Sequence, residues 1–191
     1  MRIIAGNLRG RKLKAPKGLV TRPVLARVRE ALFNVLGGVE GLRILDLFSG
    51  TGAIGLEGLS RGAQSAVFVD SGAEQCAVIR SNIDALGMDG EVIRADVFRA
   101  LDLFARKGRT FDFVFADPPY EQGMGRMAVT RVCENGILSS EGIMAVTVRK
   151  NEALPDETGS CIKLFDRKYG DTKLVMYGEK RDSTIKNIDP E

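Results

Sequence analysis

The chain of 191 residues contains no histidine. Without an imidazole it cannot carry a Ser-His-Asp triad, and it lacks both the usual general base near neutral pH and the commonest ligand of transition metals. Cysteine is scarce: Cys76, Cys133 and Cys161 are odd in number and far apart. Such a set argues against a disulfide framework or a zinc site. We therefore expect chemistry that needs no metal.

Long hydrophobic runs are also missing. No apolar run approaches the roughly 20 residues of a membrane-spanning helix, and the first seven residues, Met1 to Asn7, lack the apolar core of a signal peptide. We expect a cytoplasmic protein with no membrane partner. A chain of this length is most simply one domain that buries roughly 70% of its unfolded surface.

Negative charge is nearly absent from the first 30 residues, which contain nine lysines and arginines against one acid, Glu30. The formal charge of the whole chain is +3, so the remainder is acidic. A concentrated basic segment favours contact with nucleic-acid phosphates, although a solvated basic arm without a partner remains an alternative. The candidate RNA-binding residues are Arg9, Arg11, Lys12, Lys14, Arg22 and Arg27.

The hydrophobic pattern divides the chain into a small extension and one larger domain. Residues 1–38 read as a hairpin followed by a helix from Pro23 to Leu36, and residues 181–191 as a polar tail. Between them, residues 39–180 alternate strands and helices, which predicts an α/β fold with a doubly wound, mostly parallel, seven-stranded Rossmann-like sheet. Its last two strands form an antiparallel edge hairpin. The expected strands are 42–48, 65–70, 91–95, 111–116, 142–148, 161–168 and 173–177, and the expected helices of this domain are 53–61, 72–86, 97–107 and 124–135.

The stretch from Phe111 to Tyr120 organises the rest of the chain. A short apolar run reads as a buried strand and ends at Asp117-Pro118-Pro119-Tyr120. Two prolines cannot extend a central strand, so they hold Asp117 and Tyr120 on a stiff turn beyond the strand. Ligands of open α/β sheets bind at these strand ends. The alternative is an ordinary turn in which Asp117 caps a helix and Tyr120 packs.

A glycine-rich turn follows the first strand of the larger domain. Residues 50–55 match G-x-G-x-x-G, and Asp70 lies 20 residues after Gly50, as in a dinucleotide site. However, Asp46 just before this turn would repel a pyrophosphate and attract a cation. S-adenosylmethionine (AdoMet) carries a sulfonium and an ammonium and no phosphate, so it fits better.

The expected contacts with AdoMet come from successive strand ends. Asp70 can accept hydrogen bonds from the ribose hydroxyls, and Asp96 with the Val97 backbone can bind the adenine amino group. Each of these acids could instead be a helix cap. The full set of expected cofactor-binding residues is Asp46, Phe48, Ser49, Gly50, Thr51, Gly52, Asp70, Ser71, Asp96 and Val97.

These motifs carry a resemblance to a known family. Residues 46–57 together with Asp117–Tyr120 resemble class I AdoMet-dependent methyltransferases that act on an exocyclic amine of a base. Nearly the whole chain resembles the RsmD-type family of bacterial 16S ribosomal RNA guanine-N2 methyltransferases, in residues 1–6, 9–13, 21–23, 27–34 and 168–173. The resemblance implies an enzyme that acts on small-subunit ribosomal RNA or an assembling subunit and releases S-adenosylhomocysteine. We also expect the protein to be a monomer.

The chemistry expected of the turn follows from the weakness of an exocyclic amine as a nucleophile. Asp117 and the Pro118 carbonyl can accept its two N–H hydrogens, and Tyr120 offers a face for an unstacked base. Pro119 completes the stiff turn, so we expect Asp117, Pro118, Pro119 and Tyr120 to form the catalytic group. The alternatives are an adenine-N6 methyltransferase on DNA or RNA, a non-enzymatic RNA-binding module and, least favoured, an NAD oxidoreductase.

Overall fold

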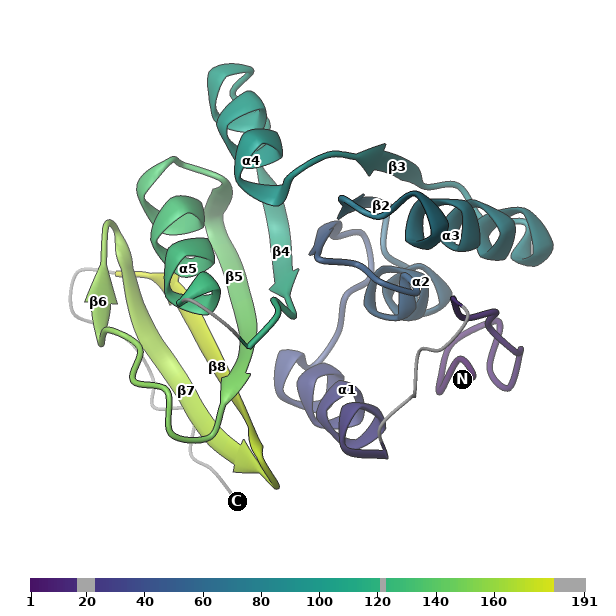
Figure 1. The fold of residues 1–191 in the computed structure, drawn as a ribbon, viewed down its shortest axis with the longest axis horizontal. Helices are drawn as coiled ribbons and strands as arrows, with labels where there is room; N and C mark the ends of the chain where they lie inside the picture. The colour runs from purple at the N-terminus through teal and green to yellow at the C-terminus, as the bar shows by residue number, and fades with distance from the viewer. Residues whose placement is uncertain (17–22, 121–122, 181–191) are drawn as a thin grey trace.

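The structure is a computed structural model that describes residues 1–16, 23–120 and 123–180. Its sheet has eight strands in the order β3-β2-β1-β4-β5-β8-β7-β6 (Figure 1). The strands are β1 (Arg43–Leu47), β2 (Ser65–Asp70), β3 (Glu91–Arg94), β4 (Phe111–Ala116), β5 (Leu138–Arg149), β6 (Glu157–Thr158), β7 (Cys161–Tyr169) and β8 (Thr172–Glu179). The helices within the described ranges are α1 (Pro23–Leu36), α2 (Ala53–Ser60), α3 (Ala73–Leu86), α4 (Val97–Arg106) and α5 (Met124–Glu134).

The predicted doubly wound, mostly parallel sheet is confirmed. Strands β3, β2, β1, β4 and β5 pair in parallel, and β8 then pairs antiparallel with β5. The strand order reverses between β1 and β4, which is the switch point where open α/β sheets bind ligands. We call the edge where these parallel strands end the carboxyl edge, and the opposite edge the amino edge.

The helices cover both faces of the sheet, as expected of a doubly wound fold. Helices α1, α2 and α3 pack on one face, the α1 face, through a core that includes Leu32, Leu56 and Ile79. Helices α4 and α5 pack on the other face through a second core, which includes Leu101 and Val129 (Figure 1). Both cores consist of buried side chains from the helices and from alternate strand positions.

The prediction of seven strands was wrong in two details. Strand β6 has only two residues and pairs with the start of β7 at the outer edge of the sheet, within a polar segment that gives no strand pattern. Strand β5 begins at Leu138 rather than near residue 142. The polar residues 139–141 lie within a register shift in its pairing with β4, between the pairs Phe111–Leu138 and Phe113–Ile143. A bulge of this kind inserts unpaired residues and hides the strand from pattern reading.

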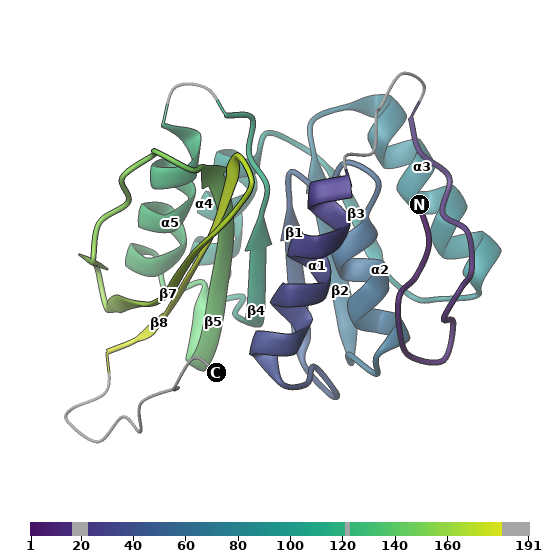
Figure 2. The ribbon, with the colours of Figure 1, turned by 90° about the horizontal axis from the view of Figure 1, so that it is seen from below.

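The sequence predicts a hairpin of two strands at the N-terminus. The segment does fold back on itself, but it does not form two regular strands. A single bridge joins Arg2 to Lys12, with backbone hydrogen bonds from Ile3 to Arg11 and from Leu13 to Met1, both of 3.0 Å. Ile3 and Leu13 are buried in the α1-face core. Residues 1–16 therefore lie along the outside of α2 and α3 (Figure 2), and they share a core with the larger domain.

Some predictions fall on residues that the structure does not describe. Arg22 and the polar tail, 181–191, lie outside the described residues. Among the helices that are described, none is long and apolar enough to cross a membrane.

Candidate active site at the carboxyl edge

Four acids predicted from the sequence gather at the carboxyl edge. Asp46 and Asp70 lie at the ends of β1 and β2, Asp96 follows β3, and Asp117 follows β4. Because these strands are parallel neighbours, their ends meet on either side of the switch point between β1 and β4. The topology thus brings the expected cofactor residues and the Asp-Pro-Pro-Tyr turn (Asp117–Tyr120) to one edge of the sheet.

The loop between β1 and α2 is shaped by its glycines. Gly52 has φ of +74°, in the left-handed region that favours glycine, and a Cβ there would lie 3.2 Å from Ile79. A Cβ at Gly55 would overlap the ring of Phe68, so the third glycine lets α2 pack directly on β2. The spacing of the motif is explained by this close packing of helix and strand.

The same loop is tied to the strands beneath it. The Ser49 hydroxyl donates to the carbonyl of Asp46 at 2.5 Å, and its oxygen also lies 3.1 Å from the carbonyl oxygen of Val69. Phe48 has φ of +54°, and its ring meets Phe98 of α4 edge to face, with 6.2 Å between ring centroids. The loop therefore has little freedom, and an aromatic pair that sequence reasoning missed closes its side toward α4.

Asp46 lies under the loop and accepts a hydrogen bond from the Gly55 backbone N–H at 3.0 Å. Only 2% of the residue is exposed. From the sequence we expect an ionised carboxylate, but burial, opposed by the Gly55 hydrogen bond and assisted by Asp117 and Asp70, raises the pKa of Asp46 to about 8. A nearby cation would favour the charged form and lower this pKa.

The raised pKa makes a prediction for stability. An unfolded chain loses the Asp46 proton near pH 3.8, whereas the folded protein keeps it until about pH 8. The folded state therefore binds more protons between these values, and the free energy of unfolding falls as the pH rises through this window. We expect Asp46→Asn, which keeps an acceptor for Gly55, to be more stable than the parent at pH 8, by up to a few kcal/mol, and similar at pH 4.

Thermal unfolding of both proteins across pH 4 to 9 measures this difference. Asp84→Asn, an exposed change on α3, is the matched control. If the difference in stability between the parent and Asp46→Asn does not increase as the pH rises, Asp46 is not protonated in the folded protein at neutral pH.

Asp70 is held by two backbone donors from segments on either side of it. Its Oδ2 accepts the Gly50 N–H and its Oδ1 the Gly72 N–H, both at 2.8 Å. A carboxylate has about four acceptor sites, so two remain for a ligand. Ser71 beside it is exposed. The carboxylate joins the glycine loop to the start of α3, which sequence spacing alone does not indicate.

Asp96 is the N-cap of α4, which is the alternative to a cofactor contact that the sequence left open for this acid. Its Oδ1 accepts the Arg99 backbone N–H at 3.0 Å. The residue is exposed, while Val97 is buried in the core. Capping uses one carboxylate oxygen and leaves the other available, so the cap does not exclude the predicted contact with adenine.

The Asp-Pro-Pro-Tyr turn is anchored by two threonines. The Thr147 hydroxyl on β5 donates to Oδ1 of Asp117, and Thr172 at the start of β8 shares a hydrogen bond of 2.8 Å with the Tyr120 hydroxyl. Both threonines are buried. Pro118 is also buried and Pro119 is exposed. The side chains of Asp117 and Tyr120 therefore each have a hydrogen-bond partner within the sheet, on β5 and on β8.

Sequence reasoning missed both threonines. Thr172 stands in residues 168–173, which carry part of the family resemblance, so a signal for it existed. Thr147 gives only the weak signal of one hydroxyl within the otherwise apolar residues 142–148 of β5.

The basic N-terminal segment is fixed to the outside of the sheet by a buried acid. Glu57 of α2 has no exposed surface and accepts the backbone N–H groups of Ile4 and Ala5 at 2.8 and 2.9 Å. It also pairs with Arg61 at 2.9 Å and lies 3.9 Å from Arg29. A buried carboxylate without partners is costly, so these contacts stabilise one position of the segment.

The predicted RNA-binding residues of this segment follow its path. Asn7 bonds to Ser60 at the end of α2, so the nearby Arg9 lies toward the amino edge. Lys14 donates to Ser81 at 2.8 Å, and its backbone is held by Asn82. Asn82 also reaches the Thr51 carbonyl, at 3.4 Å, and so links this end of the segment to the glycine loop. Arg11, Lys12 and Arg27 are exposed, with Arg11 3.3 Å from the carbonyl of Ala85.

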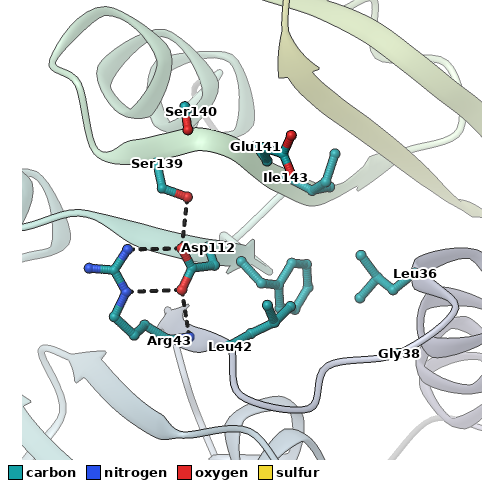
Figure 3. A pocket seen from close by; sticks show the side chains of 10 residues that line it. Leu36, Gly38, Leu42, Arg43, Asp112, Ser139, Ser140, Glu141 and Ile143 are labelled. Atoms are coloured by element: carbon teal, nitrogen blue, oxygen red, sulfur yellow. Dashed lines mark hydrogen bonds and ion pairs between the residues drawn. The ribbon is translucent and has the colours of Figure 1, made fainter. Parts of the chain in front are cut away.

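A cavity of about 540 Å³ lies at the amino edge, away from these acids. Its polar wall is the pair formed by Arg43 and Asp112, at 2.8 and 2.9 Å, which Ser139 joins by donating to Asp112 (Figure 3). Leu36, Leu42 and Ile143 contribute apolar parts of its lining. The hydrogen bonds from Arg43 hold the pKa of Asp112 well below its usual range. This acid is already satisfied, and the cavity belongs to the packing of α1 against the sheet.

Comparisons with known proteins agree with this geometry. The family model described as "Conserved hypothetical protein 95" matches residues 1–178. The "Ribosomal RNA small subunit methyltransferase D" of Escherichia coli K12 is 35% identical over 157 residues, which cover 81% of this chain and 78% of that protein. The "Putative rRNA methyltransferase YlbH" of Bacillus subtilis 168 is 34% identical over 183 residues, 94% of this chain and 100% of that protein.

A solved structure shows the same fold over almost the whole chain. The "Putative methyltransferase yhhF from Escherichia coli" superimposes with a TM-score of 0.82 at 30% identity and covers 95% of this chain and 99% of that one. With the family match over residues 1–178 and these relatives, the chain belongs to the RsmD-type family of ribosomal RNA methyltransferases.

Proposed function

We propose that this protein transfers a methyl group from AdoMet to the exocyclic N2 amine of a guanine in small-subunit ribosomal RNA. The observation that carries the proposal is the position of the Asp-Pro-Pro-Tyr turn. It follows β4 at the switch point, next to the glycine loop that follows β1, with Asp117 and Tyr120 each hydrogen-bonded to a buried threonine. The names of the relatives support ribosomal RNA over the DNA of the adenine-N6 alternative.

The residues fit AdoMet by the chemistry of their donors and acceptors. Asp70 retains acceptor sites for two ribose hydroxyls, and the exposed oxygen of Asp96 can bind an amino group. Asp46 lies behind the loop, where a cationic ligand would draw off its proton. When bound, AdoMet supplies an electrophilic methyl group. Its release as S-adenosylhomocysteine completes the reaction.

The chain's own part in the reaction is to hold the amine and its developing charge. The carboxylate of Asp117 and the carbonyl of Pro118 accept the two N–H hydrogens of the amine, so that the nitrogen lone pair leaves conjugation with the ring. Asp117 stabilises the positive charge that develops on this nitrogen and then takes a proton. The ring of Tyr120 supports the base, which must leave its stack to reach the turn.

Transfer of a labelled methyl group tests the proposal. Purified protein, labelled AdoMet and small-subunit RNA or particles lacking the modification should yield labelled N2-methylguanosine after digestion to nucleosides. Labelled N6-methyladenosine would support the alternative, and binding of RNA without any transfer would support a non-enzymatic module.

We further propose that the enzyme acts as a monomer in the cytoplasm, on free RNA or an assembling subunit.

Asp70 gives the cofactor prediction. We expect Asp70→Asn to weaken AdoMet binding by roughly 1–3 kcal/mol, about ten- to a hundredfold, because its amide replaces one acceptor oxygen with a donor. Calorimetry measures the affinity. Because Asp70 also holds Gly50 and Gly72, an analogue of S-adenosylhomocysteine without ribose hydroxyls separates direct from indirect effects. The parent should distinguish this analogue from S-adenosylhomocysteine more strongly than the variant does. Equal discrimination would remove Asp70 from the ribose site.

A further inference from the structure

The α1 face of the sheet carries two short rows of side chains next to the Asp-Pro-Pro-Tyr turn. In the first row Arg149 of β5 pairs with Thr172 of β8, which pairs with Tyr169 of β7. In the second row Thr147 pairs with Leu174, which pairs with Arg167. Leu174 belongs to the α1-face core. Because alternate residues of a strand share a face, all six side chains lie on this face.

These rows join the turn to two arginines. The threonine in each row holds one side chain of the turn, Thr147 that of Asp117 and Thr172 that of Tyr120. Arg149 is one strand away from Thr172, and Arg167 is two strands away from Thr147. Adjacent strands lie roughly 4.8 Å apart. The two guanidinium groups are therefore within side-chain reach of the rim of the proposed base site.

Neither arginine is used to neutralise an acid. Nearby carboxylates are taken by lysines: Asp171 by Lys150 at 2.6 Å, and Asp166 by Lys173 at 3.3 Å. Across the described ranges no carboxylate lies within ion-pair distance of Arg149 or Arg167. Both side chains belong to exposed residues.

Arg167 is also ordered by an aromatic ring. Its guanidinium carbon lies 6.0 Å from the centroid of the half-buried Tyr169. Tyr169 packs against the α1-face core, so the ring itself is held in place. A planar guanidinium supported on a ring keeps its outer N–H groups available for two oxygens of a charged acceptor such as a phosphate.

We propose that Arg149 and Arg167 bind phosphates of the RNA strand on either side of the target nucleotide. The inference rests on the proposed function, since a nucleotide at the turn must leave its flanking phosphates at the rim. Bidentate contacts to phosphate suit these groups. The surface formed by Arg149, Arg167 and Tyr169 is separate from the N-terminal basic segment, which packs on α2 and α3 across the switch point. The RNA then crosses the carboxyl edge between two basic regions.

The test uses RNA binding in the presence of S-adenosylhomocysteine, so that no transfer occurs. We expect the double variant Arg149→Gln with Arg167→Gln to bind a transcript of small-subunit RNA about tenfold or more weakly at ~0.15 M salt. The slope of log affinity against log salt should fall by roughly 1.4, the value for two contacts to a single strand. Affinity for S-adenosylhomocysteine should not change, and this also shows that the variant is folded.

Two further variants make the result specific. Arg106→Gln with Lys107→Gln removes the same charge from the exposed end of α4, at the amino edge, and should leave the salt slope within a few tenths of the parent value. Arg149→Lys with Arg167→Lys keeps the charge and should retain most of the slope. The proposal is overturned if the glutamine double variant keeps the RNA affinity and salt slope of the α4 control. It is also overturned if the lysine double variant loses as much RNA affinity and salt slope as the glutamine double variant. Failure of the proposed function is distinct, because the parent would then bind RNA without methylating guanine.

Discussion

Asp117→Asn should lower methyl transfer by about two orders of magnitude or more, while AdoMet still binds. The substitution keeps the size of the side chain, replaces one acceptor with a donor and removes the negative charge. In the structure the Oδ1 of Asp117 accepts the Thr147 hydroxyl. An asparagine oxygen can keep this bond, so its NH₂ group would then face the substrate amine. A donor would oppose an N–H, and the developing positive charge would lose its counter-charge. Loss of one such transition-state contact costs ~2.7–4 kcal/mol.

The same strand provides a matched control. Asp112 lies on β4 five residues earlier and is paired with Arg43 at the amino edge. We expect Asp112→Asn to reduce thermal stability, because the Arg43 pair holds the pKa of Asp112 well below its usual range, and to leave the rate of methyl transfer within a few-fold. Single-turnover rates with saturating RNA and calorimetric AdoMet affinities measure both variants. Turnover of folded Asp117→Asn near that of the parent would make Asp117 a simple strand-end residue.

The parts of the site that follow from local chain geometry were predictable. The backbone at Gly52 is left-handed, and at Gly55 the helix approaches the strand closely. Both positions require glycine, so the spacing of the motif predicts them. The strand before Asp117 was equally clear, since apolar residues rich in β-formers end at two prolines. The approximate place of every helix followed from its periodicity, with boundaries shifted by at most one residue.

The parts that depend on contacts distant in sequence were not predictable. Thr147 meets Asp117 across 30 residues, and Glu57 meets Ala5 across 52. Neither pairing leaves a pattern along the chain. Glu57 lies on a helix whose sequence gives no sign of a long-range contact. Its hydrogen bonds to Ile4 and Ala5 nevertheless hold the basic segment along α2. The protonation of Asp46 has the same origin, because it depends on burial beneath a loop that closes only in the folded protein.

Strand β6 illustrates the limit for secondary structure. Two residues are too few to show alternation, and Glu157 and Thr158 pair only because the start of β7 presents a free edge to them. The early part of β5 was hidden in a similar way by its register shift against β4. In both places the partner strand, and not the local sequence, makes the strand.

Thr147→Val is the second change that we expect to affect the rate strongly. Valine matches threonine in shape but cannot donate a hydrogen bond, so Oδ1 of Asp117 would lose the hydrogen bond that it accepts from the Thr147 hydroxyl on β5. A hydrogen bond to a charged group is worth about 1.5–3 kcal/mol, which corresponds to a fall in kcat of roughly ten- to a hundredfold. Because Thr147 has no exposed surface, it cannot touch RNA itself. It is a positioning residue.

Two measurements separate the positioning role of Thr147 from simple packing. One asks whether the loss is in kcat or in KM, and the other asks whether Thr147→Ser restores the rate. We expect the loss in kcat, with KM for RNA and the affinity for AdoMet within a few-fold of the parent, because Tyr120 and the cofactor residues keep their partners. Thr147→Ser retains the hydroxyl, loses only a methyl group and should restore most of the rate, although it is the more cavity-forming change of the two. If the serine variant is as slow as the valine variant, or the valine variant is as fast as the parent, the orientation of Asp117 does not depend on Thr147.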